Sequence, residues 1–215
     1  LYLGAGVGMG AVKLIGRGRR ERSLRRDDLP YVIGMIALDI AAPILLMLGL
    51  RRTTPETAAL LNNFEIVATS LIALILFRET ISRRLWLAIV LVTAASALLS
   101  VEDAGSLRFS AGSIYVLLAC VCWGFENNCT RKISSKDPLQ IVLLKGIFSG
   151  LGSVVIGLCI GERITVPWSV FAVLGVGLVA YGLSIFTYIY AQRSLGAART
   201  CLLYTSPSPR DVEES

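Results

Sequence analysis

The hydrophobic pattern of this 215-residue chain consists of long apolar runs separated by short segments rich in charged and turn-forming residues. The runs are continuous rather than alternating, which favours buried or lipid-facing helices over half-buried strands. A helix needs about 20 apolar residues to cross a hydrocarbon layer about 30 Å thick. The pattern therefore predicts seven membrane-spanning helices, over residues 1–16, 29–50, 57–77, 84–101, 110–130, 138–160 and 168–192.

The composition supports a membrane-embedded chain. Hydrophobic residues make up 54% of the sequence and charged residues 17%, and the mean hydropathy is +0.68. One soluble domain of this size does not hide so much apolar surface. In lipid, every backbone N–H and C=O group must be paired internally, which leaves helices or a closed barrel. Because the runs are continuous, the predicted fold class is all-α, a polytopic transmembrane helical bundle.

Several kinds of chemistry are disfavoured by the residue types present. The net charge of +6 comes from basic residues in loops beside the predicted spans rather than from one basic face, so we expect no nucleic-acid partner. The chain has no histidine, which is the commonest metal ligand and general base, and its five cysteines include no C-x-x-C pair. We therefore expect no metal site, no cofactor, no disulfide framework and no enzymatic activity.

The positive charges of the loops alternate along the chain. The first, third, fifth and seventh loops carry most of the Lys and Arg residues, and the first of them, over residues 17–28, contains six arginines. Basic loops stay on the cytoplasmic side of a membrane, so the alternation predicts the orientation and supports the number of spans. We expect a multi-pass protein of the cell membrane whose loop 17–28 lies in the cytoplasm.

Sliding the chain against itself at an offset of 142 residues reveals a weak internal repeat. It aligns Gly8 with Gly150 and Arg51 with Arg193. Five predicted spans, an odd number, separate the two arginines, so the repeated motif lies once on each side of the membrane. This is the pattern of an inverted-topology repeat, from which many secondary transporters are built.

We expect that neither end of the sequence is a natural end. The sequence begins without methionine inside the apolar run 1–15, and we expect it to be truncated there. Residues 201–215 break the membrane pattern abruptly and resemble the translation of a sequencing-library adapter. We therefore interpret 201–215 as a non-native tail; the alternative is a disordered tail rich in Ser and Pro.

Two acidic residues lie deep inside predicted spans, where an ionisable group is costly and usually faces a cavity or a partner. Asp39 lies about 15 Å along its span, and Glu65 about 12 Å along the next span from the opposite side, so both approach the midplane. Asn62, Glu65 and Thr69 share one helical face that is suited to lining a pathway. Either carboxylate is a candidate for coupling transport to protons; the alternative is a packing role through hydrogen bonds.

Further candidates lie on the later spans. Glu126 near the inner end of its span and Lys145 about 12 Å into the following span are expected to pair across adjacent helices. Lys145 is also a candidate attractor for an anionic group of a solute. Other side chains would line the cavity, with packing as the alternative for the aromatic ones: Trp123, Asn127, Asn128, Tyr181 and Ser184. Together with Asp39, Asn62, Glu65 and Thr69 they form the predicted substrate pathway.

Three segments carry a resemblance to a known family: residues 62–79 (NNFEIVATSLIALILFRE), 48–51 (LGLR) and 191–200 (AQRSLGAART). They resemble the EamA family of the drug/metabolite transporter superfamily, whose members have ten helices arranged as two inverted five-helix repeats. The resemblance implies that residues 1–101 form a first repeat without its first helix. Residues 110–200 would then form a second repeat without its last two helices.

The resemblance also implies a function. We expect a transporter of small metabolites, such as amino-acid-like solutes, that works by alternating access and is a candidate for proton coupling. The expected partners are the lipid bilayer, a small-molecule solute and protons, with a second copy of the chain as a further candidate. Two alternatives are a membrane-embedded enzyme, with only Asp39, Glu65 and Glu126 to serve as acids or bases, and a membrane scaffold.

Overall fold

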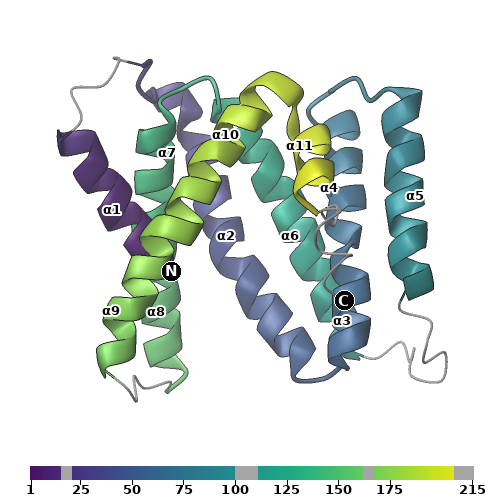
Figure 1. Cartoon of the computed structure of the whole chain (residues 1–215), viewed down its shortest axis with the longest axis horizontal. Helices are drawn as coiled ribbons and strands as arrows, with labels where there is room; N and C mark the ends of the chain where they lie inside the picture. Colours follow the sequence, from purple (N-terminus) through teal and green to yellow (C-terminus); the bar gives the residue numbers. More distant parts are fainter. Residues whose placement is uncertain (16–20, 100–110, 162–166, 206–215) are drawn as a thin grey trace. The chain divides into compact units, whose positions relative to one another are not determined.

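The computed structural model describes residues 1–15, 21–99, 111–161 and 167–205, and helices joined by turns account for this part of the chain, with no strand in it (Figure 1). The helices coincide with the seven predicted spans, and the bounds agree to within a few residues. They are α1 (Tyr2–Ile15), α2 (Leu29–Leu50), α3 and α4 (Pro55–Asn62 and Phe64–Ile75), α5 (Arg83–Leu99), α6 (Ala111–Ile133), α7 and α8 (Pro138–Leu144 and Gly150–Cys159), and α9 and α10 (Pro167–Val176 and Leu183–Leu195).

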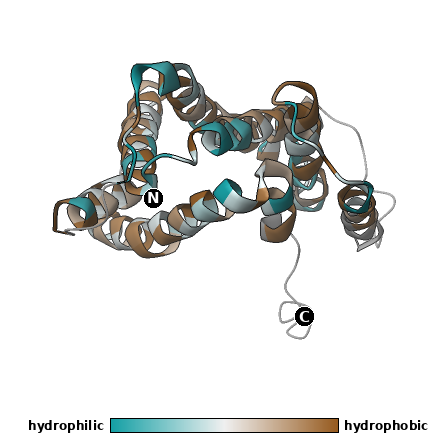
Figure 2. Ribbon diagram, turned by 90° about the horizontal axis from the view of Figure 1, so that it is seen from above, coloured by the Kyte–Doolittle hydropathy of each residue, from teal (hydrophilic) through white to brown (hydrophobic). Residues whose placement is uncertain are grey.

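The prediction of a helical membrane bundle is confirmed. Within the described residues, four helical segments are long and apolar enough to cross a membrane by themselves: Arg26–Leu50, Pro55–Ile75, Pro138–Cys159 and Trp168–Leu195. Figure 2 shows hydrophobic colour along most of the helical ribbons. Many large apolar side chains on these helices are exposed, among them Ile33, Val155 and Phe171. Apolar side chains that find no protein neighbour are suited to contact with acyl chains.

Proline and a polar cap fix two of the helix starts. Thr54 precedes Pro55 at the start of α3, and its side chain accepts a hydrogen bond from the backbone N–H of Thr57 at 3.3 Å. Asp137 precedes Pro138 at the start of α7, and its side chain accepts from the N–H of Leu139 at 3.0 Å. Proline lacks only an N–H that has no helical partner in the first turn, so both helices begin at these residues.

The chain divides into two compact units, each of which has its own core. Unit 1 contains residues 1–40 and 129–194. Here α1 packs against α7, α8 and α9 and against two π-helical turns, η3 (Lys145–Ser149) and η4 (Gly177–Gly182). Its core is made of Ala5, Met9, Val32, Met35, Ile133, Ile141, Val142 and Ile189.

Glycines on α1 and η3 allow the backbones of unit 1 to approach each other. A methyl group at Gly146 would lie 2.5 Å from the Cα atom of Gly6 and 2.7 Å from the carbonyl oxygen of Tyr2. A methyl group at Gly4 would collide with the carbonyl group of Leu174. Only residues without a side chain fit at such contacts. The glycines that repeat along α1 are therefore packing surfaces.

Unit 2 contains residues 41–128 and the chain from Leu195 onward. One part of its core joins Ala58 and Leu61 of α3 to Val116 and Cys120 of α6. Another part joins Ile66 of α4 to Ile89 of α5 and to Cys201 of a further helix, α11 (Ala197–Thr205).

Helix α11 was not among the predicted spans. The sequence interpretation assigned residues from 201 onward to a non-native tail, yet 201–205 continue this helix and Cys201 is buried against α4 and α5. Gly196, with a φ of +88°, makes the turn between α10 and α11, and only glycine adopts that backbone conformation without strain. Residues 206–215 and Arg17, Arg19 and Arg20 of the first loop lie outside the described residues.

The predicted span 57–77 is interrupted in the structure. Helix α3 ends at Asn62, and α4 begins at Phe64 after one residue, Asn63, that closes the last turn of α3 through its N–H. The two π-helical turns likewise interrupt the predicted spans 138–160 and 168–192. Hydrophobic patterning over some 20 residues does not resolve such local changes, which often mark functional sites.

Candidate functional site

A buried ion pair joins two helices of unit 1. The ammonium group of Lys145 lies 3.5 Å from Oδ1 of Asp39, and their side chains are only 5% and 2% exposed. The hydroxyl group of Tyr2 donates to the same Asp39 oxygen at 3.1 Å. Two opposite charges removed from water remain stable only when they are paired and hydrogen-bonded, as they are here.

A proline explains why Tyr2 lies beside Asp39. Pro43 lies inside α2 and has no N–H, so the carbonyl oxygen of Asp39, four residues earlier, lacks its usual helical donor. The Tyr2 hydroxyl lies 3.5 Å from that carbonyl oxygen. Sequence analysis singled out Asp39 but missed Tyr2, because the residue that supplies the replacement donor is 37 positions away. Helix α2 itself stays continuous through Pro43.

Both π-helical turns of unit 1 contribute to this site. Lys145 is the first residue of η3, and Tyr181 lies in η4, where its ring packs edge-to-face against the ring of Tyr2 with centroids 4.9 Å apart. Helix α1 contacts both turns through its glycine-rich face. The site therefore combines an acid, a base and two phenols from four helical segments. Such a set is suited to a small solute that carries both charges.

A second polar cluster lies in unit 2, between α4 and α6. The side-chain amide of Asn127 donates to Oε1 of Glu65 at 2.9 Å and to the Thr69 hydroxyl at 3.3 Å. The amide of Asn128 donates to the carbonyl oxygens of Thr69 at 3.0 Å and of Gly124 at 2.8 Å. A methyl group at Gly124 would lie 2.9 Å from the backbone nitrogen of Thr69, so glycine is what brings α6 this close to α4. Thr69, Asn127 and Asn128 are buried, whereas Glu65 is half-buried.

The break between α3 and α4 lies next to this second cluster. The carbonyl groups of Leu61 and Asn62 face the thiol of Cys120, whose sulfur lies 3.4 Å and 3.7 Å from the two oxygens. A thiol is a weak donor, and here it satisfies backbone groups that an unbroken helix would pair internally. Cys120 therefore has a structural explanation that its place in an apolar run did not suggest.

The remaining predicted residues are placed as follows. In the structure Lys145 pairs with Asp39, and Glu126 is buried in unit 2, so the expected pair of Lys145 and Glu126 stays a prediction. Trp123 and Ser184 are half-buried, and the carbonyl oxygen of Ser184 accepts a hydrogen bond from the Thr187 hydroxyl. Asp39 and Glu65 belong to different units, so their common depth in the membrane stays a prediction.

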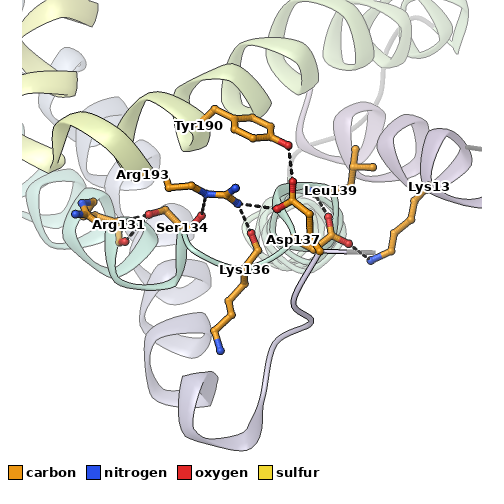
Figure 3. Close-up of polar contacts among 9 residues, drawn as sticks. Lys13, Arg131, Ser134, Lys136, Asp137, Leu139, Tyr190 and Arg193 are labelled. Carbon is orange, nitrogen blue, oxygen red and sulfur yellow. Dashed lines mark hydrogen bonds and ion pairs between the residues drawn. The ribbon is translucent and has the colours of Figure 1, made fainter. Parts of the chain in front are cut away.

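One end of unit 1 carries a network of charged residues from three predicted cytoplasmic loops (Figure 3). Arg193, near the end of α10, donates to the carbonyl oxygens of Ser134 and Lys136, each at 2.7 Å, and to a carboxylate oxygen of Glu21 at 2.8 Å. The turn between α6 and α7 is thereby tied both to α10 and to the segment before α2. Sequence reasoning used Arg193 only in the repeat and the charge count and did not foresee these contacts.

Further ion pairs surround the same turn. Lys13 of α1 lies 2.7 Å from Asp137, and Lys136 lies 3.0 Å from Asp28. The Tyr190 hydroxyl donates to Glu21 at 2.7 Å, and the Arg193 guanidinium group lies over the Tyr190 ring. The hydrogen bond from Arg193 holds the pKa of Glu21 below its ordinary value, because it stabilises the charged carboxylate. The Glu21 carboxylate therefore stays charged at neutral pH.

Buried charge within apolar helices is typical of membrane proteins that move solutes or ions, and the comparisons point to such a family. The EamA-like transporter family matches residues 2–101 and 110–208, so the chain belongs to that family. An uncharacterized transporter of Methanothermobacter thermautotrophicus is 28% identical over 197 residues, and the transporter YyaM of Bacillus subtilis, also uncharacterized, is 20% identical over 203 residues. These alignments cover 87% and 90% of this chain but 57% and 66% of the relatives.

A solved crystal structure shares the fold. It superposes with a TM-score of 0.70 at 16% sequence identity and covers 98% of this chain and 79% of the other. At this identity the likeness concerns the fold alone. The family assignment therefore depends on the family match, and the relatives named as transporters agree with it.

Proposed function

We propose that this protein carries small zwitterionic metabolites, such as amino-acid-like solutes, across the cell membrane by alternating access, and that Asp39 and Lys145 bind the solute. The single observation that carries the proposal is the buried ion pair between these residues in a member of a transporter family. An ionisable residue inside a membrane protein is costly and usually marks a substrate or ion pathway.

The arrangement of the pair suggests the class of solute. A carboxylate and an ammonium group 3.5 Å apart are together neutral, so the site offers one partner for each charge of a zwitterion. A bound amino acid would replace one internal ion pair by two, from its carboxylate to Lys145 and from its ammonium group to Asp39. A solute with one charge would leave the other protein charge buried without a partner, which is strongly unfavourable.

The charged network around Arg193 fits the inner side of such a carrier. It joins segments that the positive-inside rule assigns to the cytoplasm, and it closes one end of unit 1 through ion pairs and hydrogen bonds. In alternating access, each end of the protein opens and closes in turn. We infer that this network belongs to the conformation that is closed toward the cytoplasm.

Proton coupling is assigned to Glu65 rather than to Asp39. Asp39 already has an ammonium partner, whereas the hydrogen bonds of Glu65 to Asn127 and Cys201 are with neutral groups. Glu65 is half-buried whereas the Asp39 side chain is only 2% exposed, so a proton reaches the Glu65 carboxylate more readily. Acidification inside vesicles during solute movement, lost in Glu65→Gln, is the expected result; flux without proton movement would contradict this assignment.

The experiment is uptake of the twenty radiolabelled L-amino acids into proteoliposomes that contain the product of the complete reading frame. Asp39→Asn and Lys145→Gln should each abolish uptake that the parent protein supports. Glu56→Gln is the control, because Glu56 is exposed in the first turn of α3. Unchanged flux in both charge variants, or no uptake of any amino acid by the parent, would reject the proposal.

A further inference from the structure

One strip of the helical segment from α7 to α8 faces α2 in unit 1. Lys145 pairs with Asp39 of α2, and a methyl group at Gly152 would collide with the side chain of Ile40, the next residue of α2. Positions 145, 149 and 152 follow i, i+4 and i+7 spacing, which places them on one helical face. Ser149 therefore lies between the two positions whose contacts with α2 are observed.

The neighbouring strip of the same segment faces α1. Methyl groups at Gly146 and Gly150 would lie against Gly6 and Leu3, respectively. With α2 on one side and α1 beside it, Ser149 has no route to lipid, and its side chain is fully buried. Its hydroxyl group thus lies one turn from Lys145, on the face that also contacts Asp39.

The Ser149 hydroxyl has no hydrogen-bond partner among the described residues. A buried serine in a regular helix usually bonds to the carbonyl oxygen four residues earlier, but this serine ends the π-helical turn η3. Buried polar groups without a partner are rare in folded proteins and call for an explanation. A ligand that supplies the missing acceptor provides one.

We propose that Ser149 is a third polar residue of the solute-binding site, and that its hydroxyl donates to the carboxylate of the zwitterion whose charge Lys145 neutralises. Asp39 then binds the ammonium group of the solute. The inference rests on the proposed function and deepens it, because it names a residue that determines the preference for carboxylate-bearing solutes. Ser149 was not among the candidates that the sequence suggested.

The first test is chemical modification of Ser149→Cys in proteoliposomes, with the parent protein as the background for its own five cysteines. The probes are an anionic reagent, 2-sulfonatoethyl methanethiosulfonate, and a cationic one, 2-aminoethyl methanethiosulfonate. Because the pair of Lys145 and Asp39 is neutral overall, the introduced thiol should react with both probes, and it should favour the cationic probe once Lys145→Gln leaves the Asp39 carboxylate without this ammonium group. The matched control is Val155→Cys in α8 of the same helical segment, where the native side chain is 57% exposed. A thiol there, expected to lie against acyl chains, should not react with either charged probe.

Protection of the introduced thiol by solutes then tests whether position 149 recognises the carboxylate of the solute. A mixture of L-alanine, L-serine, L-leucine and L-phenylalanine should slow modification of the Ser149→Cys variant severalfold. The corresponding amines without the carboxylate, namely ethylamine, ethanolamine, isoamylamine and phenethylamine, should not. An inert thiol at position 149, or equal protection by amines and amino acids, would overturn the proposal. Because reactivity needs no net transport, an inert thiol there in a protein that takes up amino acids rejects this inference alone.

The kinetics of uptake then separate an effect on solute binding from an effect on folding. Ser149→Ala should raise the KM for amino-acid uptake about tenfold with little change in kcat, as expected for one lost hydrogen bond to a charged group. Ser70→Ala is the control: its hydroxyl is equally buried and has no partner among the described residues, but it belongs to unit 2. An equal rise of KM in both variants, or none in Ser149→Ala, would contradict a role of Ser149 in the site.

Discussion

The energetic coupling between Asp39 and Lys145 gives the sharpest test of the site. Lys145→Gln removes the ammonium group and leaves a carboxylate that is only 2% exposed. Breaking a buried ion pair by removing one partner costs about 3–5 kcal/mol. The Tyr2 hydroxyl still donates to Asp39 at 3.1 Å, so we expect the lower end of that range, about 3 kcal/mol.

The double variant reveals whether the two residues depend on each other. Asp39→Asn alone leaves a buried ammonium group and should cost about as much as Lys145→Gln. Together, the two substitutions leave two neutral amides, so the double variant should be more stable than the sum of the single effects predicts, by about 2–3 kcal/mol. For a chain of this size, a loss of about 3 kcal/mol lowers Tm by about 6–12 °C.

The assay is thermal unfolding of the parent, both single variants and the double variant in lipid nanodiscs. Lys13→Gln is the matched control. Lys13 lies closer to its partner Asp137, at 2.7 Å, but its side chain is 37% exposed, so its loss should cost less than about 1 kcal/mol. The reasoning is refuted if Lys145→Gln costs no more than Lys13→Gln, or if the two single effects add within about 0.5 kcal/mol.

Three further predictions concern packing and the charged network. Arg193→Lys should lower the free energy of unfolding by about 1–3 kcal/mol, because an ammonium group cannot keep all three hydrogen bonds of the guanidinium group. Glu21→Gln should lower it by less than about 1 kcal/mol. If Glu21→Gln destabilises more than Arg193→Lys, the network is not as described. Since the pKa of Glu21 is lowered in the folded state, its stabilisation is present at neutral pH and is lost as the pH falls below 4.5 and through the folded-state pKa. The Tm difference between Glu21→Gln and the parent should therefore shrink in acid; a constant difference would refute the pairing. Gly146→Ala should destabilise the protein by more than about 2 kcal/mol, because the added methyl group would meet Gly6. Gly157 has open space around it, so Gly157→Ala should be neutral or stabilising by up to about 1 kcal/mol. Equal Tm values for the two variants would exclude the close approach of the backbones.

In the candidate site, local sequence patterns predict the depth of a residue in the membrane but not the residues that it contacts. The depth of Asp39 and Lys145 in their spans follows from counting residues, because each residue of a helix advances by a fixed amount. Their partners do not follow from this count. The sequence matched Lys145 to Glu126 of the neighbouring span but did not suggest Asp39, which pairs with Lys145 from 106 positions away. Long-range pairs of this kind depend on how helices pack rather than on their order.

Interruptions of the helical backbone were also not predicted from the sequence. Pro43 removes one backbone donor from α2, yet the helix stays continuous, and the Tyr2 hydroxyl lies beside the Asp39 carbonyl oxygen that lacks this donor. Conversely, no proline occurs within residues 59–67 around the break at Asn63 or within residues 141–149 around the start of the π-helical turn at Lys145. These features arise from contacts with other helices, such as the thiol of Cys120 and the close approach of Gly6, and a hydropathy window does not detect them.

The sequence by itself determined that the chain is a bundle of membrane helices, where most of those helices begin and end, and which family it resembles. These properties follow from hydrophobic periodicity, capping residues and motifs, all of which act over one helix or less. Tertiary structure alone decided that Tyr2, Asp39 and Lys145 share one buried site with Ser149 one turn away, and that Arg193 joins three loops. Such sites bring together residues far apart in the chain, because the cost of burying a charge is met only where packing supplies an opposite charge or a hydrogen bond.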